Sequence, residues 1–82
     1  MLSTAFSYEE NRVGFEEGVV VFNPLSNNML MIDHLTDSII RFVSAGETSY
    51  SSVYPEFEDI IPRHYFNQVI SQLIDQDIID SK

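Results

Sequence analysis

The sequence predicts a small α+β domain in which an antiparallel sheet of two to three strands precedes a bundle of three helices. Two apolar runs, residues 19–22 and 29–32, are separated by a turn-forming segment and predict a β-hairpin. After the hairpin, apolar residues recur at helical spacing in two longer segments. A chain of 82 residues has room for one hydrophobic core, so we expect a single domain over residues 1–82.

The strands are expected in the first third of the chain. The opening residues are mixed in character, and a short leading strand is expected within residues 4–8 or 12–16. Residues 19–22 form the clearest strand, because their β-branched side chains suit a pleated, covered surface. The segment 23–28 breaks this strand with a proline and three asparagines, since Asn tolerates the left-handed backbone that tight turns require. Residues 29–32 then return as its partner.

Two helices are expected in the middle of the chain. Asp33 should cap the first of them, because its carboxylate can accept the free amides of a first helical turn. Gly46 should end this helix in the left-handed conformation. Thr48 or Ser49 should start a short second helix, which Pro55 limits to one or two turns. The apolar positions of the first helix are Leu35, Ile39, Ile40, Phe42 and Val43.

The last helix has the sharpest helical periodicity. A connector with an inward-pointing Phe57 leads to it, and Pro62 suits its first position, where a missing amide needs no partner. We expect the helix to end at Asp77 and residues 78–79 to fold back onto the core. Its core stripe is Phe66, Val69, Ile70, Leu73 and Ile74.

The chain is strongly acidic. Thirteen Asp and Glu stand against four Lys and Arg, for a net charge of -9. The 44% hydrophobic content is ordinary for a globular protein, so this acidity does not indicate disorder. The cations are scattered, which disfavours nucleic-acid binding through phosphate contacts. They are Arg12, Arg41, Arg63 and Lys82.

Composition also limits chemistry and location. The sequence has no cysteine, which excludes disulfides, thiolate metal sites and cysteine nucleophiles. Its longest apolar runs, such as residues 19–22, are too short to span a bilayer, and nothing near Met1 resembles a signal peptide. We therefore expect a soluble cytoplasmic protein.

No catalytic constellation is recognisable. The only histidines in the sequence are His34 and His64, and both are interpreted as surface residues in the first turns of their helices. Residues 75–80 superficially match the start of a calcium loop but lack its glycine and closing glutamate. The glutamate pairs at 9–10 and 16–17 are interpreted as solvated charges. We expect neither enzymatic activity nor a bound cofactor or metal.

Binding is the remaining class of function, and residues 29–32 are its candidate strand. A small sheet must leave edges, and this strand lacks the lysine, proline or bulge that usually protects one. Two interpretations of Met29 and Met31 are open. Both side chains face the core, or the strand is an open edge that accepts an extended peptide by β-augmentation.

Four segments carry a resemblance to a known family. They are Val-Val-Val-Phe at 19–22, Met-Leu-Met-Ile-Asp at 29–33, Ala-Gly-Glu-Thr at 45–48, and residues 69–79. With their order along residues 12–80, they resemble the PqqD-like family, also called the RiPP recognition element. Residues 15–26 are further similar to its subgroup associated with HPr-kinase-related proteins. Asn-Asn-Met-Leu stands at 27–30 where that subgroup often has Gly-Asp-Thr-His, and Asp77 stands where the family commonly has glycine.

The resemblance implies a non-catalytic, winged-helix-like domain that binds the leader segment of a ribosomally made precursor peptide. It also implies that the domain presents this leader to a peptide-modifying enzyme. In the family, the leader adds as a strand beside the third strand, and its side chains enter the groove against the third helix. The strand residues implied here are Met29, Leu30, Met31, Ile32 and Asp33. On the helix we expect Arg63, His64, Asn67, Gln68 and Ser71, which flank the core stripe.

Two other classes of function stay open. A hairpin followed by three helices is also close to the topology of winged-helix DNA-binding domains, but the last helix offers only Arg63 against Asp75 and Asp77. The other class is a protein-interaction or dimerisation module, and an unprotected edge is compatible with a monomer or a sheet-paired homodimer. Given the net charge of -9, we expect a bound peptide to be mainly apolar, and neutral or mildly basic at its flanks.

Overall fold

The computed structural model describes residues 1–46 and 48–81, and it confirms the α+β class. A three-stranded antiparallel sheet contains β2 (Arg12–Gly14), β3 (Val19–Asn23) and β4 (Asn28–Ile32), in the order β2-β3-β4. It is therefore a sheet of the predicted size, and β2 lies within the second of the two ranges expected for a leading strand. Residues Glu47 and Lys82 lie outside the described part of the chain, as does the part of the 45–48 motif that Glu47 contributes.

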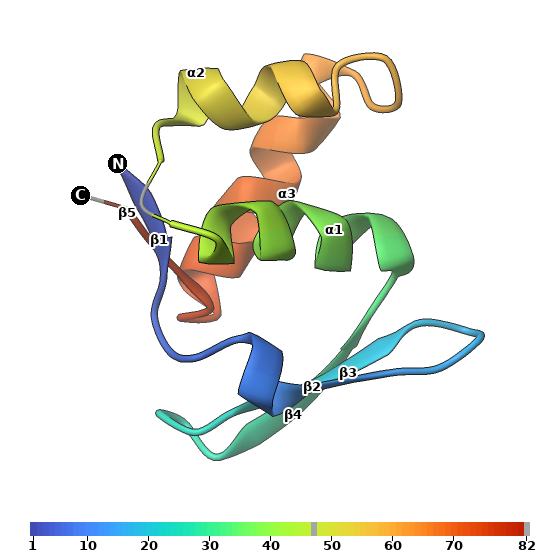
Figure 1. Cartoon of the computed structure of the whole chain (residues 1–82), viewed down its shortest axis with the longest axis vertical. Helices are drawn as coiled ribbons and strands as arrows, with labels where there is room; N and C mark the ends of the chain where they lie inside the picture. Colours follow the sequence, from blue (N-terminus) through green and yellow to red (C-terminus); the bar gives the residue numbers. More distant parts are fainter. Residues whose placement is uncertain (47, 82) are drawn as a thin grey trace.

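Three α-helices follow this sheet within the described residues. They are α1 (His34–Ser44), α2 (Tyr50–Val53) and α3 (Arg63–Asp75). Figure 1 shows the three-stranded sheet at one end of the molecule and α2 at the other, with α1 between them. Short 3-10 helices, η1 (Glu9–Asn11) and η2 (Tyr54–Glu56), precede β2 and follow α2.

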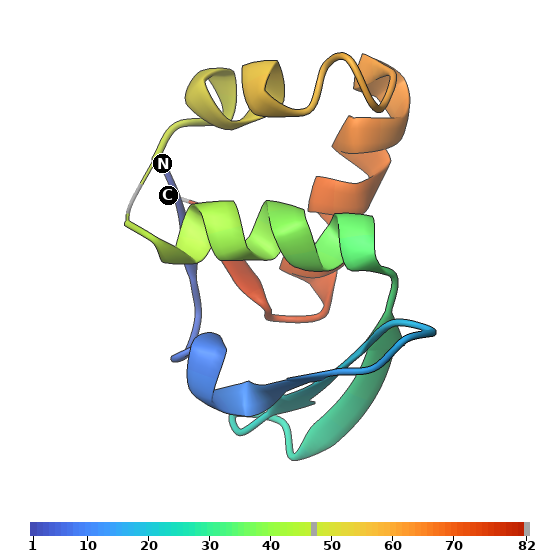
Figure 2. The same cartoon turned by 45° about the vertical axis from the view of Figure 1, so that its right-hand side comes forward.

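The two ends of the chain form a second, two-stranded sheet that sequence patterns did not indicate. Strand β1 (Leu2–Thr4) pairs antiparallel with β5 (Ile79–Ser81), so the termini lie side by side (Figure 2). Of the expected range 4–8, only Thr4 lies in β1. A three-residue strand is too short to show an alternating pattern, and its partner is at the far end of the sequence. The expected return of residues 78–79 to the core is confirmed, because both isoleucines are buried.

Helix α1 begins as predicted and ends differently. The Thr36 amide donates to the Asp33 carboxylate (2.7 Å), which confirms the N-cap. Gly46 does not adopt the left-handed conformation. The helix ends instead with the Ala45 amide bonded to the Arg41 carbonyl and the Gly46 amide to the Val43 carbonyl, a tightened last turn that needs no positive φ.

The ends of α3 depend on two residues named from the sequence. Pro62 is the N-cap, so the helix begins one residue later than predicted, and it ends at Asp75, two residues before the predicted end at Asp77. At the other end, Asp77 adopts a φ of 59°, so an aspartate occupies the left-handed position that closes the helix. The Ile78 amide donates to the Leu73 carbonyl (2.9 Å) and the Asp77 amide to the Ile74 carbonyl (3.0 Å), which is the Schellman pattern of helix closure.

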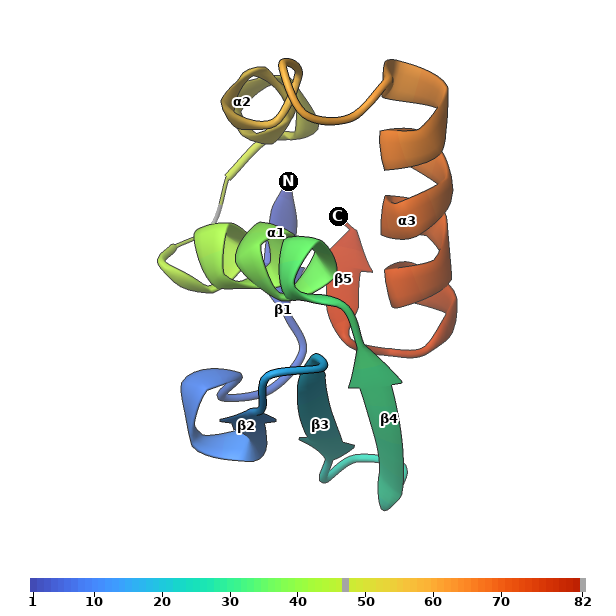
Figure 3. The same ribbon diagram turned by 90° about the vertical axis from the view of Figure 1, so that its right-hand side faces the viewer.

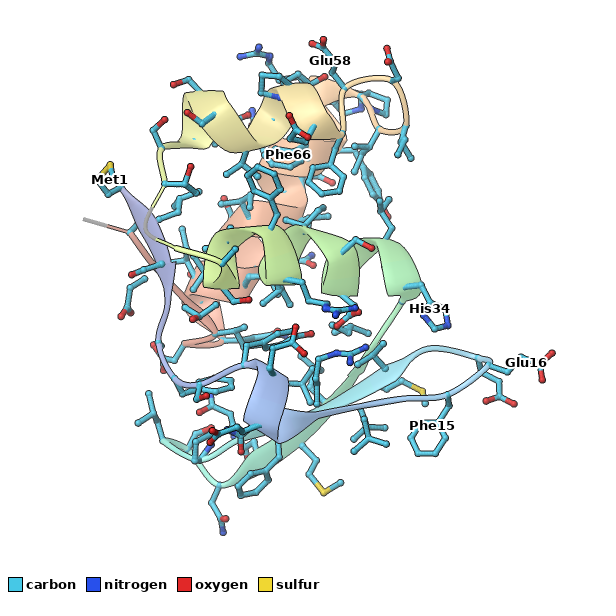
Figure 4. The ribbon with its side chains drawn as sticks, in the orientation of Figure 1. Met1, Phe15, Glu16, His34, Glu58 and Phe66 are labelled. Carbon is cyan, nitrogen blue, oxygen red and sulfur yellow. The ribbon has the colours of Figure 1, made fainter. Side chains whose placement is uncertain are left out.

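The core lies between the helices and the inner face of the sheet. Phe66 of α3 is fully buried and points toward α2 and η2, where it makes edge-to-face contacts with Tyr50 and Tyr54 (Figure 4). Val19 and Val21 of β3 complete the core from the sheet. The buried apolar residues of the three α-helices are Ile39, Ile40, Val43, Val53, Phe66, Ile70 and Leu73.

One buried polar cluster joins the N-terminal segment to α1. Asp37 accepts hydrogen bonds from the Tyr8 hydroxyl (2.7 Å), from Arg12 Nε (2.8 Å) and from Arg12 Nη2 (3.0 Å). Only 6% of the Asp37 side chain is exposed, and Tyr8 is buried. Burial and the neighbouring Asp37 carboxylate raise the pKa of the Tyr8 hydroxyl, so it stays a hydrogen-bond donor.

Gly18 lies where β3 begins and comes close to the end of β4. A methyl group on Gly18 would lie 2.6 Å from the Ile32 carbonyl oxygen, and backbone cannot move aside as a flexible side chain can. We expect Gly18→Ala to lower the free energy of unfolding by about 1–3 kcal/mol, measured by urea denaturation.

Gly46→Ala is the matched control for this prediction, because a methyl group there has nothing within 4 Å. It should change the free energy of unfolding by about 0.5 kcal/mol or less. Equal effects of the two variants would contradict the argument from close approach.

None of the helices in the described ranges is both long enough and apolar enough to cross a membrane.

Candidate functional site

The site begins at β4, which is an edge of the three-stranded sheet. Strand β3 separates β4 from β2, and no described strand pairs with the other side of β4. Figure 3 shows β4 as the outermost strand of this sheet, on the same side of the molecule as α3. The prediction of an unprotected edge at residues 29–32 is therefore correct for the described residues.

The direction of the free backbone groups follows from the hairpin between β2 and β3. There the Phe15 amide donates to the Gly18 carbonyl (2.7 Å), so the backbone groups of Gly18 point toward β2. Backbone groups of successive residues point to alternate sides of an antiparallel strand. The backbone amide and carbonyl of every second residue of β3, beginning with Val19, therefore point toward β4.

The same alternation identifies the free groups of β4. Leu30 pairs with Val21 and Ile32 pairs with Val19, so the backbone groups of Leu30 and Ile32 point toward β3. Those of Met29 and Met31 point away from the sheet. The open edge thus offers two amides and two carbonyls at alternate residues, the arrangement that an added strand requires.

A cleft runs between this edge and α3. One part, of about 250 Å³, lies between the end of β4 and the middle of α3; its lining includes Ile32, Tyr65, Val69 and Gln72. A second part, of about 400 Å³, lies between the start of β4 and the last turn of α3. Leu30 and Gln76 line both parts, so together they form a continuous groove along β4, called the β4–α3 cleft below.

The side chains of β4 point to opposite faces of the sheet. Leu30 and Ile32 are half-buried and pack against the core, while 71% of Met29 and 59% of Met31 are exposed on the outer face. The structure thus rejects the interpretation in which both methionines face the core. Their β3 partners, Phe22 and Val20, are half-buried on the same outer face.

Asn23 fixes the hairpin to the end of α3. Its side-chain amide lies 3.1 Å from the Gln76 carbonyl and 3.3 Å from the Asp77 carbonyl, and its side-chain oxygen accepts the Leu25 amide. Asn23 is buried, so these bonds are shielded from water. This residue therefore sets the separation of β4 and α3 at one end of the cleft. The sequence marked it only as part of a turn.

The five helix residues predicted for the site do not line the cleft. Arg63 stacks on the Tyr54 ring, with its guanidinium carbon 4.6 Å from the ring centroid. Asn67 accepts a hydrogen bond from the Tyr50 hydroxyl. The other three, His64, Gln68 and Ser71, are exposed and line neither part of the cleft.

The helix side of the cleft consists of residues that were not predicted for the site. Tyr65, Gln72 and Gln76 lie on the opposite flank of the core stripe from Asn67, beside Val69 at the edge of that stripe. A helical pattern shows which stripe is buried, but both flanks of that stripe are equally half-exposed. Tyr65 was the one signal on the correct flank. A single exposed tyrosine on a helix is weak evidence for a binding site.

The cleft is negatively charged. Asp33 lines the part next to the end of β4, and Asp75 and Asp77 line the part next to its start. Hydrogen bonds from Thr36 lower the pKa of Asp33, which keeps it ionised. Among the described residues, no cationic side chain lines either part. The three arginines are engaged elsewhere, Arg12 with Asp37, Arg41 with Glu9 and Arg63 with Tyr54.

The remaining candidate groups form no second site in the described chain. The imidazole Nε2 of His34 lies 3.1 Å from the Glu16 carbonyl, where it links α1 to the tip of the β2–β3 hairpin (Figure 4). Within residues 1–46 and 48–81, no three acidic or histidine side chains are grouped as metal ligation requires. No family model, no curated protein and no solved structure matched this chain.

Proposed function

We propose that this protein is a non-catalytic peptide-binding domain that recognises the leader segment of a ribosomally made precursor peptide and presents it to a modifying enzyme. The observation that carries the proposal is the open edge of β4 beside the β4–α3 cleft. The resemblance of residues 12–80 to the PqqD-like family supports it. A precursor made by ribosomes meets such a domain in the cytoplasm, which is where we place the protein.

Strand addition explains how one small domain could bind a disordered leader. Main-chain hydrogen bonds to Met29 and Met31 give affinity that tolerates sequence variation, at about 1 kcal/mol net for each bond. Alternate side chains of the leader would enter the cleft against Val69 and Gln72. Ordering the leader costs conformational entropy, so we expect only modest affinity for the isolated segment.

The test uses a library of random-sequence peptides displayed on their own mRNA and selected against the immobilised domain. A selected peptide is then titrated into isotope-labelled protein, and backbone amide chemical shifts are followed by NMR. The largest shifts are expected at Met29 and Met31 and along the flank of α3 that carries Val69 and Gln72. Shifts confined to α2 or to the flank that carries Asn67 would contradict the proposal.

A further inference from the structure

The surroundings of the open edge describe the peptide that would fit it. A strand added beside β4 extends the sheet, so its side chains point alternately into the cleft and to the outer face. On the cleft side they meet the half-buried Leu30, Ile32 and Val69. An added strand therefore finds apolar contacts on this side.

The outer face is apolar as well. Met29 and Met31 project there beside the half-buried Val20 and Phe22, and Val13 of β2 is 57% exposed on the same face. None of these five residues is charged. An added strand would place its other alternate side chains next to Met29 and Met31, at the spacing of cross-strand neighbours. Apolar residues thus suit both faces of the strand.

The two ends of the edge are acidic. Asp33 follows β4 directly, and Asp75 and Asp77 face the start of β4 across the cleft. In the described chain, neither Asp75 nor Asp77 forms an ion pair. From Met29 to Asp33 the chain advances four residues, which corresponds to roughly 13 Å along a strand.

We infer that the peptide bound at this edge carries a continuous apolar run of about four or five residues with a lysine or arginine at each end. This inference rests on the proposed function and specifies its substrate class. A peptide that alternated apolar and polar residues would leave one apolar face uncovered. Acidic residues at its ends would meet Asp33 at one end and Asp75 and Asp77 at the other. Since both ends of the edge are acidic, the charges do not select between parallel and antiparallel binding.

The test compares peptide selections on three proteins with the same random library. The first is the wild type. The second carries Asp75→Asn and Asp77→Asn; both changes preserve folding, because Asn tolerates positive φ and a neutral residue suits a helix C-terminus better than an acid. The control carries Glu58→Gln and Asp59→Asn, two exposed neighbours in the chain. Glu58 lies at the opposite end of the molecule from the three-stranded sheet (Figure 4). Each double variant removes two negative charges.

We expect peptides enriched by the wild type to show apolar residues at consecutive positions between two basic residues. In the Asp75→Asn, Asp77→Asn variant, the preference for a basic residue at one end should disappear. The affinity of a wild-type-selected peptide should fall about three- to tenfold at low salt. The control variant should keep both preferences, because it removes the same net charge but leaves the acidic residues at the ends of the edge unchanged.

Two outcomes separate a failure of this inference from a failure of the proposed function. Enriched peptides whose binding is lost with Met31→Pro, but which lack basic ends or alternate in polarity, would overturn the inference and leave strand addition standing. A selection that yields no peptide sensitive to Met31→Pro would overturn both. Equal loss of basic residues in the two double variants would also overturn the inference, since the preference would then follow net charge.

Discussion

Asp37→Ala is expected to lower the free energy of unfolding by about 3–5 kcal/mol, because it leaves the Arg12 guanidinium without its partner in a site that is mostly shielded from water. The Tyr8 hydroxyl loses its acceptor in the same change, and because it is buried it is left without a hydrogen bond. A domain of this size has a total stability of about 4–12 kcal/mol. The loss is therefore a large fraction of the whole, and urea denaturation followed by circular dichroism measures it.

Two further variants test the cause of this loss. Asp37→Asn keeps an oxygen for the Tyr8 hydroxyl but removes the charge that Arg12 requires. Its free energy of unfolding should therefore lie between those of the wild type and Asp37→Ala. Glu9→Gln is the matched surface control, since the Glu9–Arg41 pair is about half exposed on both sides (53% and 52%). It should cost about 1 kcal/mol or less. A similar cost for Glu9→Gln and Asp37→Ala would contradict the account of a buried pair.

Local sequence patterns were sufficient for the elements whose signals are local. The β-branched run predicted β3, Asp33 as an N-cap predicted the start of α1, and the apolar stripe with a period of 3.6 residues predicted α3. The tolerance of Asn and Asp for positive φ is confirmed at Asn27 (60°) and Asp77 (59°). Each of these depends on neighbours within a few residues, which is why a single sequence is enough.

Features that depend on distant contacts were not predicted. Strand β1 exists because it pairs with β5 at the other end of the chain, and Asp37 is buried because Arg12 and Tyr8 reach it from the N-terminal segment. The strand side of the candidate site was predictable, since an edge without protecting residues is visible in the sequence. The helix side was not, because only the placement of β4 relative to α3 decides which flank lines the cleft.

The central claim is that peptides bind by adding a strand to the free edge of β4, and Met31 carries one of the free amides. Met31→Pro removes that amide and should weaken binding of a library-selected peptide by at least tenfold. The loss combines one hydrogen bond with an unpaired peptide carbonyl, for about 2–4 kcal/mol together. Proline is tolerated at an edge whose amide makes no bond within the sheet, so the fold should persist.

The measurement that tests this claim most directly is isothermal titration of one selected peptide into wild type, Met31→Pro and Met31→Ala. Met31→Ala keeps the amide and removes the side chain, so it separates backbone pairing from contact with the outer face. Circular dichroism of each variant verifies that it is folded. Strand addition predicts a loss of at least tenfold for Met31→Pro and a clearly smaller loss for Met31→Ala. Unchanged affinity in a folded Met31→Pro variant would contradict it.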